Sequence, residues 1–169
     1  LAFPETGIGI YPGLGGTQRS TRLIGKGLAK YLIATGAMLD AQKALRYGLV
    51  DKVIESIKGL SELTTLTDIR SQSGKERNLP EEKFSNFNGQ LNESSFSEPF
   101  IKENEKLLRR KAPKALSLAM RLIDEGEKVS LDEGLKLELE HLDEIFKTKD
   151  ARAGLGSVIA KTRPEFLGQ

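Results

Sequence analysis

Glu5 is the first residue whose type and surroundings could do chemistry. It follows a Phe-Pro step and precedes Ile8 and Ile10. A carboxyl group among apolar neighbours is partly desolvated, which raises its pKa toward the range that a general acid or base needs. An isolated glutamate is more often an ordinary surface charge, so the residue alone leaves both interpretations open.

The second such feature is a glycine-rich run between Gly7 and Gly16, which leads into a predicted helix. Its spacing does not fit the dinucleotide-binding pattern GxGxxG, and no Lys-Ser or Lys-Thr pair follows as a P-loop requires. What remains is a tight turn followed by the unpaired first N–H groups of a helix. Those groups either belong to a purely structural turn or face an anion or a ligand oxygen.

The first of three stretches, residues 1–58, is rich in glycine and aliphatic side chains. We expect a strand-like start, then helices, then a short strand over 50–54, where Val and Ile favour extended backbone. Asp40 is the expected N-cap of the third helix, and Gly48 follows its end. The expected helices cover residues 17–24, 26–35 and 40–47.

The second stretch, residues 59–100, is dense in Ser, Asn and Glu and has no sustained period of 2 or 3.6 residues. This composition is typical of a long surface loop or a disordered insertion. Three phenylalanines, Phe84, Phe87 and Phe96, could pin part of it to the surface of the core.

The third stretch, residues 101–169, is predicted to be helical. Ser130 and Glu133 have the spacing of a capping box at the start of a long amphipathic helix. Glu138 lies on the apolar face of that helix, where we expect a buried partner such as an arginine. The expected helices cover residues 101–111, 113–125, 131–146 and 150–161, the last with Asp150 as its cap.

Two further patterns concern the surface of this stretch. Leu131, Leu135, Leu139, Leu142 and Phe146 recur at helical spacing, so this stripe faces a core or a partner. The charged residues over 102–114 are interpreted as a solvated helix face.

Composition excludes several classes of protein. The 26 Lys and Arg residues are interleaved with 24 Asp and Glu residues, for a net charge of +2, which argues against a nucleic-acid partner. The chain has no Cys and one His, which excludes a disulfide scaffold, a thiol nucleophile and Cys- or multi-His metal sites. No apolar run reaches the ~18–20 residues of a membrane span. We expect a cytoplasmic protein that binds neither metal nor membrane.

Several motifs together resemble the enoyl-CoA hydratase/isomerase (crotonase) family. They are Phe3-Pro4-Glu5, the run from Gly9 to Arg19 that ends in Gly-Gly-Thr-Gln-Arg, the block 44–51, and residues 150–166 as the closing helix. The resemblance implies an α/β crotonase-like fold, of which this chain would be the C-terminal portion, with 59–100 as an insertion. A start within a motif also fits a fusion behind a 3-hydroxyacyl-CoA dehydrogenase.

Members of this family bind acyl-CoA thioesters, and their hydratases use two glutamates and an oxyanion hole of two backbone N–H groups. The resemblance places Glu5 on the second glutamate, which usually gives the α-carbon its proton. It also implies a substrate-binding wall beside the acyl chain, formed by Pro12, Gly13, Leu14 and Gly15. Lys161 resembles a lysine that helps to hold the CoA phosphates, although a solvated lysine at a helix end is the alternative.

The other parts of the family's catalytic apparatus, the first glutamate and both oxyanion-hole donors, belong to motifs upstream of the Pro-Glu block and are not in this sequence. The resemblance therefore implies a chain that is inactive, or nearly so, by itself. For the parent protein it implies hydration of 2-trans-enoyl-CoA in fatty-acid β-oxidation, with no cofactor unless a dehydrogenase upstream brings NAD. A trimer or hexamer is expected. The alternatives are an isomerase of the same family and a non-catalytic oligomerisation or docking domain.

Overall fold

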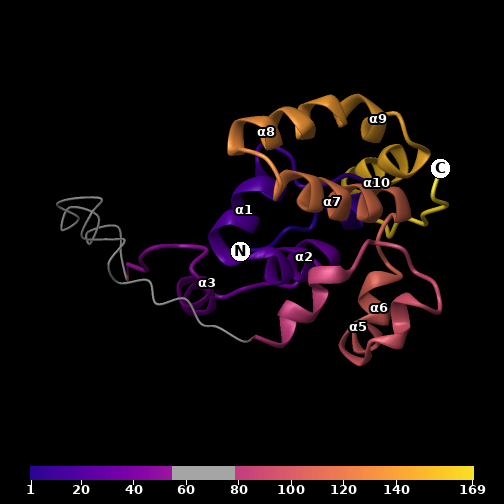
Figure 1. Cartoon of the computed structure of the whole chain (residues 1–169). Coiled ribbons are helices and arrows are strands. Elements are labelled where there is room, and N and C mark those ends of the chain that lie inside the picture. Colours follow the sequence, from indigo (N-terminus) through magenta and orange to yellow (C-terminus); the bar gives the residue numbers. More distant parts are fainter. Residues whose placement is uncertain (55–78) are drawn as a thin grey trace.

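The structure, a computed structural model, describes residues 1–54 and 79–169, and these are organised as helices and short 3-10 turns (Figure 1). None of the helices described is long and apolar enough to cross a membrane. The α-helices are α1 (Gly16–Ile24), α2 (Lys26–Thr35), α3 (Ala41–Tyr47), α5 (Pro99–Glu103), α6 (Glu105–Leu108), α7 (Pro113–Gly126), α8 (Leu131–Glu140), α9 (Leu142–Phe146) and α10 (Lys149–Ala160). The 3-10 turns are η1 (Glu5–Ile8), η3 (Pro80–Asn86) and η4 (Ser95–Ser97).

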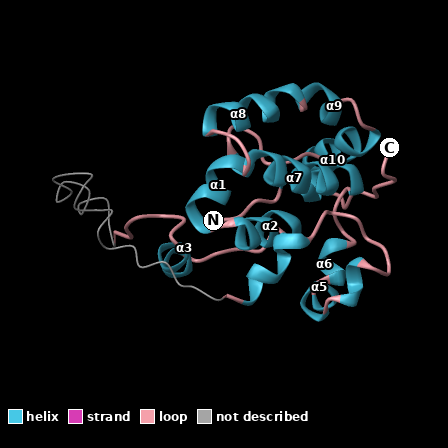
Figure 2. Ribbon diagram, viewed as in Figure 1, coloured by secondary structure: helices cyan, strands magenta, loops and turns pink. Residues whose placement is uncertain are grey.

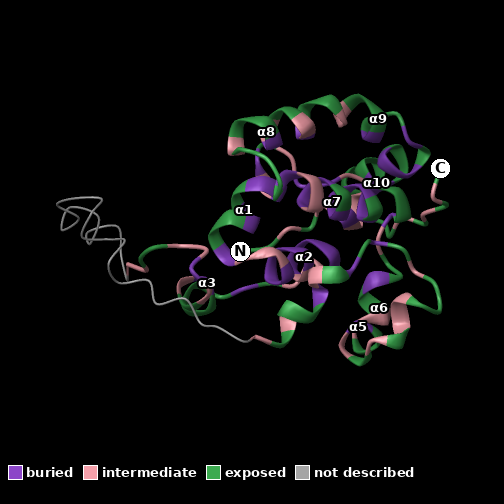
Figure 3. Cartoon of the chain, in the orientation of Figure 1, coloured by how far each residue is buried: buried purple, intermediate pink, exposed green. Residues whose placement is uncertain are grey.

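Helices α2 and α7 form the centre of the fold, and both are buried over most of their length (Figure 3). Ile33 and Ala34 of α2 belong to the same buried cluster as Leu116, Ala119 and Ile123 of α7. Alanines in both helices keep the side chains short, so the two backbones can approach closely. The leucines of α7 lie on one broad apolar face, and this face is the one that the core buries.

The strand predicted over 50–54 and the strand-like start were both wrong, since the described residues contain no strand (Figure 2). The N–H groups of Leu49 and Val50 donate to the Ala44 carbonyl, at 2.9 and 3.3 Å, and so complete the end of α3. Leu1 exchanges two hydrogen bonds with Leu39, at 2.7 and 2.8 Å. A strand needs a continuing row of such partners, and the described residues supply none.

Helix starts and stops with a clear capping signal were predicted well. Helix α2 has the predicted bounds. Asp40 caps α3 by accepting a hydrogen bond from the Lys43 N–H at 2.7 Å, and Gly48 ends it in the left-handed conformation. Ser130 and Glu133 form the predicted capping box of α8. Local hydrogen bonding therefore decides these boundaries.

Two predicted helices are each broken in the middle. The helix expected over 101–111 is divided into α5 and α6 at Asn104, whose side chain donates to the Phe100 carbonyl at 2.8 Å. The helix expected over 131–146 is divided into α8 and α9 at His141. No glycine or proline marks either break, which explains why periodicity alone did not predict it.

Asp150 does not cap the last helix, contrary to the prediction. Thr148 is the N-cap of α10 and accepts from the Ala151 N–H at 2.9 Å. The buried Asp150 carboxylate accepts instead from the N–H groups of Leu167 and Gly168, at 2.7 and 2.8 Å. Asp150 thereby holds the C-terminal tail against the start of α10.

Residues 79–100 are attached to the core through their phenylalanines, as was suggested for this part of the second stretch. Phe84 and Phe87 are buried, and Phe96 is partly buried against the same cluster. Lys30 of α2 binds this segment as well, because its ammonium donates to the Ser85 and Phe87 carbonyls at 3.1 and 2.8 Å. The part of the second stretch before residue 79 lies outside the described residues.

Lys30 is also paired with Asp124 of α7 at 2.8 Å, and its side chain is only 1% exposed. We expect Lys30→Met to lower the free energy of unfolding by about 2 kcal/mol, because two carbonyls lose their donor. The matched control is Lys26→Met, which removes a more exposed partner of the same aspartate and is expected to cost under about 1 kcal/mol. Urea unfolding measures both values, and equal values would contradict the buried role of Lys30.

Candidate active site

Glu5 begins the 3-10 turn η1, which is held from two sides. The Thr6 hydroxyl donates to the Ile33 carbonyl in α2 at 2.9 Å, and the Thr6 carbonyl accepts from the Ala112 N–H at 2.9 Å. The turn ends at Gly9 with φ of +86°, where a Cβ would lie 2.4 Å from a backbone oxygen of α10. Only glycine fits there. These contacts fix the backbone that carries Glu5.

The Glu5 side chain is partly buried, and its Oε2 atom is buried without a hydrogen-bond partner among the described residues. Burial raises the pKa of the carboxyl group above 4.5, while the positive charge of Lys111 acts in the opposite direction. A buried carboxyl oxygen without a partner is uncommon, and such groups are concentrated at functional sites. The group is suited to giving and taking a proton.

Glu5 faces a cavity of about 650 Å³ whose walls are mostly apolar. One wall belongs to the segment after η1, and the opposite wall to α8 and α9. The lining residues are Glu5, Ile10, Tyr11, Gly13, Leu14, Gly15 and Arg19 on the first side, and Leu135, Glu138, Leu139, Leu142 and Phe146 on the second. Four of the five residues of the predicted leucine stripe thus line the cavity, all except Leu131.

The structure brings three of the four predicted wall residues to the cavity of Glu5. Gly13, Leu14 and Gly15 line it, whereas Pro12 is buried and does not. Leu14 has φ of +56°, and its side chain is 100% exposed. A bulky residue in this conformation is unusual. Substrate binding by these four residues stays a prediction.

Glu138 is a buried carboxylate, 3% exposed, on the opposite wall of the cavity, and it holds the glycine-rich turn in place. The carboxylate accepts from the Gly15 N–H at 2.6 Å, from the Thr17 N–H at 3.0 Å and from the Thr17 hydroxyl. The buried partner predicted for Glu138 is present, but it consists of two backbone N–H groups and a hydroxyl and not of the arginine suggested as an example. The first N–H groups of α1, which could have faced a bound anion, are therefore paired with the Glu138 carboxylate of the protein itself.

Tyr11 adds a second link between the same two walls. Its hydroxyl donates to the backbone carbonyl of Glu138. Burial is the main cause that raises the pKa of Tyr11 to about 12, so the hydroxyl keeps its proton across the physiological range. Sequence reasoning missed Tyr11, and no spacing signal pointed to it.

Lys161 lies away from the cavity of Glu5. It ends α10 in the left-handed conformation with φ of +54°, and it is exposed. It does not line the cavity that contains Glu5. Contact of Lys161 with a CoA phosphate stays a prediction.

The raised pKa of Glu5 has a consequence for stability. The protonated form is favoured in the folded chain, so the stabilising contribution is present below pH 4.5 and is lost as pH rises through the folded pKa. We expect Glu5→Gln to be more stable than the parent chain at pH 7, by a margin that shrinks toward pH 4. Thermal unfolding of both proteins at a series of pH values measures the margin. A constant margin would contradict a raised pKa.

The described fold is similar to that of a carnitinyl-CoA dehydratase from Mycobacterium thermoresistibile. The two share 22% identity with a TM-score of 0.67, over 98% of this chain and 53% of that one. At this identity the likeness shows the fold, which is of the crotonase type. Structure and site together therefore define a protein of the crotonase fold that has a partly buried carboxyl group at an apolar cavity.

The chain belongs to the enoyl-CoA hydratase/isomerase family, whose model matches residues 1–68. A short-chain-enoyl-CoA hydratase of Clostridium acetobutylicum is 33% identical over 96% of this chain and 48% of its own length. An enoyl-CoA isomerase/hydratase of Mycosarcoma maydis is 31% identical over 100% of this chain and 48% of its own length. The chain thus spans about half the length of the curated relatives it matches.

Proposed function

We propose that the chain carries the proton-transferring carboxyl group of an enoyl-CoA hydratase, and that this group is Glu5. The observation that carries the proposal is the buried, unpartnered Oε2 of Glu5 at an apolar cavity of about 650 Å³. Such a cavity suits the hydrocarbon part of a 2-trans-enoyl-CoA better than a charged substrate. The family and the names of the two relatives support the reaction type.

In the proposed reaction, water adds across the 2,3-double bond to give 3-hydroxyacyl-CoA. Oxygen bonds to C3, and the protonated Glu5 gives its proton to C2 while charge develops on the thioester oxygen. Glu5 is suited to this step because burial raises the pKa of its carboxyl group, which favours the protonated form that gives the proton. The wall of α8 and α9 would exclude bulk water from C2.

The other glutamate, the family's first, which takes a proton from the attacking water, and the two donors to the thioester oxygen would come from residues outside these 169. The proposal therefore includes that the chain alone turns over little or no substrate. Positioning of two carboxyl groups around one alkene is lost when either group is missing. A cytoplasmic setting and β-oxidation as the pathway complete the proposal.

Isomerisation of the double bond is the second candidate, and one observation favours it. Among the described residues that line the cavity, Glu5 is the one carboxylate with a buried oxygen that has no hydrogen-bond partner, whereas both oxygens of Glu138 accept hydrogen bonds. An isomerase can move a proton between C2 and C4 with a single acid/base group. The M. maydis relative is named for both reactions.

Product analysis distinguishes the candidates. The chain and a version extended upstream would each be incubated with crotonyl-CoA and with 3-butenoyl-CoA. The proposal predicts 3-hydroxybutyryl-CoA from crotonyl-CoA with the extended protein, and little or none with the 169-residue chain. Conversion of 3-butenoyl-CoA to crotonyl-CoA without hydration would assign isomerisation, and an inactive extended protein would reject both candidates.

A homotrimer or a pair of trimers is also proposed for the parent protein. Apolar side chains of α8, α9 and α10 are exposed in the single chain, among them Leu139 at 64%, Phe146 at 50% and Ile159 at 87%. Exposed apolar patches of this kind mark interaction surfaces. Light scattering tests the assembly. A trimer without activity in the extended protein would favour the docking-domain alternative.

A further inference from the structure

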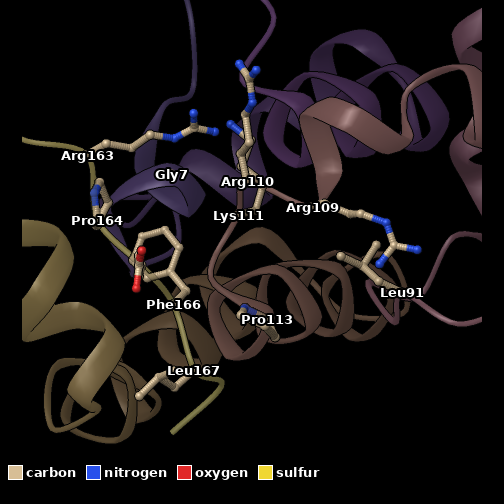
Figure 4. Close-up of a pocket in the computed structure, with 11 residues that line it drawn as sticks. Gly7, Leu91, Arg109, Arg110, Lys111, Pro113, Arg163, Pro164, Phe166 and Leu167 are labelled. Atoms are coloured by element: carbon tan, nitrogen blue, oxygen red, sulfur yellow. The ribbon is translucent and has the colours of Figure 1, made fainter.

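A second and larger cavity, of about 980 Å³, lies beside the connection between α6 and α7 (Figure 4). It is separate from the cavity of Glu5, and the two share no lining residue. Three consecutive cations, Arg109, Arg110 and Lys111, line one side, and Arg163 of the C-terminal tail lines the other. Glu165 is the one acidic residue in the lining.

Three of these four cations form no ion pair among the described residues, although the Lys111 charge still acts on Glu5 at longer range. Arg109 is engaged, because its Nε lies 2.6 Å from the Glu105 carboxylate and its guanidinium stands 5.1 Å from the centre of the Phe96 ring. In Figure 4 it extends away from the others, toward Leu91. Arg110, Lys111 and Arg163 form no ion pair in the part of the chain that the structure covers.

Arg110, Lys111 and Arg163 come from two separate segments of the chain and line the same cavity. Figure 4 shows the Arg163 side chain extending from the tail toward Arg110 and Lys111. The Lys111 ammonium lies deep, since a Cβ built at Gly7 would be 3.6 Å from it and one built at Gly36 would be 2.7 Å from it. Burial and the charge of Arg110 both lower the pKa of Lys111, whereas Glu5 raises it. Crowded positive charge in a partly buried place is stabilised by an added anion.

We propose that this cavity, formed by Arg110, Lys111 and Arg163, binds a small phosphate-bearing anion with at least two negative charges. Guanidinium groups bind phosphate oxygens through paired N–H donors, and a nearby ammonium adds a compact positive charge. A small anion is favoured over an acidic peptide because Lys111 lies partly buried, where an extended chain reaches poorly. Phe166 and Pro113 provide an apolar flank.

The run of charges over 102–114 was predicted to be a solvated helix face, and the structure corrects this for its last part. Helix α6 ends at Leu108, and Arg110 and Lys111 lie in the connection to α7. The chain turns there so that both residues line the cavity and no longer follow a helical face. The tail residue Arg163 is brought opposite them because Asp150 holds residues 167 and 168.

Titration calorimetry with inorganic pyrophosphate tests the proposal on the 169-residue chain. We expect saturable binding to one site, weakened at least tenfold by Arg163→Gln and by Arg110→Gln. Both side chains are exposed, so these variants are expected to fold, and far-UV circular dichroism checks this. The matched control is Arg152→Gln, an exposed arginine of α10 outside the cavity, which should leave binding unchanged.

Absence of saturable binding would overturn the proposal, and so would an equal loss in Arg152→Gln. Tighter binding of an oligoglutamate peptide than of pyrophosphate would overturn the assignment to a small anion. A competition with coenzyme A identifies the source of the phosphate. If coenzyme A displaces pyrophosphate and the displacement depends on Arg163, the cavity binds the phosphates of the coenzyme. If pyrophosphate stays bound in the presence of coenzyme A, the cavity binds a free anion. Neither result depends on hydratase activity.

Discussion

Glu5→Gln is expected to lower the kcat of crotonyl-CoA hydration in the upstream-extended protein by a hundredfold or more. The amide keeps the size of the side chain but cannot give a proton to C2, and loss of a general acid typically costs 10²–10⁴-fold. The KM should change little, because the apolar walls that would hold the substrate are untouched. Initial rates follow from the loss of conjugated-thioester absorbance.

The control for this substitution is Glu140→Gln. Glu140 is an exposed residue of α8 that lies two positions from Glu138 and does not line the cavity. It makes the same chemical change on the surface, so its rate should equal that of the parent protein. A Glu5→Gln variant with a nearly unchanged kcat would remove Glu5 from the proposed reaction.

Glu138→Ala is expected to have the largest effect on stability, lowering the free energy of unfolding by about 4 kcal/mol. The substitution leaves the N–H groups of Gly15 and Thr17 and the Thr17 hydroxyl without their acceptor in a buried place. Each unsatisfied buried donor costs about 1–3 kcal/mol, and the three costs are not additive. Urea unfolding followed by far-UV circular dichroism measures the change.

Two further variants distinguish the loss of these hydrogen bonds from the effect of simply shortening a side chain in α8. Glu138→Gln keeps one acceptor oxygen but directs an NH₂ donor at other donors, so we expect about half of the alanine effect. Glu140→Ala, on the exposed face of the same helix, should stay within about 0.5 kcal/mol of the parent chain. If Glu138→Ala and Glu140→Ala unfold at the same urea concentration, the carboxylate does not hold the turn.

Local signals predicted the helices that have them. Asp40 and Gly48 at α3, and Ser130 with Glu133 at α8, satisfy helix ends through hydrogen bonds a few residues apart. The strand over 50–54 failed for the opposite reason, since a strand depends on partners that may be distant in sequence. The breaks at Asn104 and His141 were missed because no glycine or proline stands at either position to signal the end of a helix.

The sequence predicted individual residues of the candidate site better than the hydrogen bonds that link them. Glu5 and the glycine-rich turn were singled out from residue types, and the structure brings them to one cavity. The Glu138 carboxylate was recognised as out of place on an apolar face, yet its partners lie more than 120 positions away. Hydrogen bonds over such separations leave no periodic trace in one sequence, so the sequence predicted that Glu138 has a buried partner but did not identify the groups that bind it.

The central claim is that Glu5 exchanges a proton with the carbon next to the thioester. Proton NMR in D₂O measures this step without hydration, by following deuterium entry at C2 of saturated butyryl-CoA in the upstream-extended protein. The account predicts exchange in the parent protein and in Glu140→Gln, and at least about a hundredfold slower exchange in Glu5→Gln. Exchange in Glu5→Gln at the parent rate would contradict the assignment of Glu5.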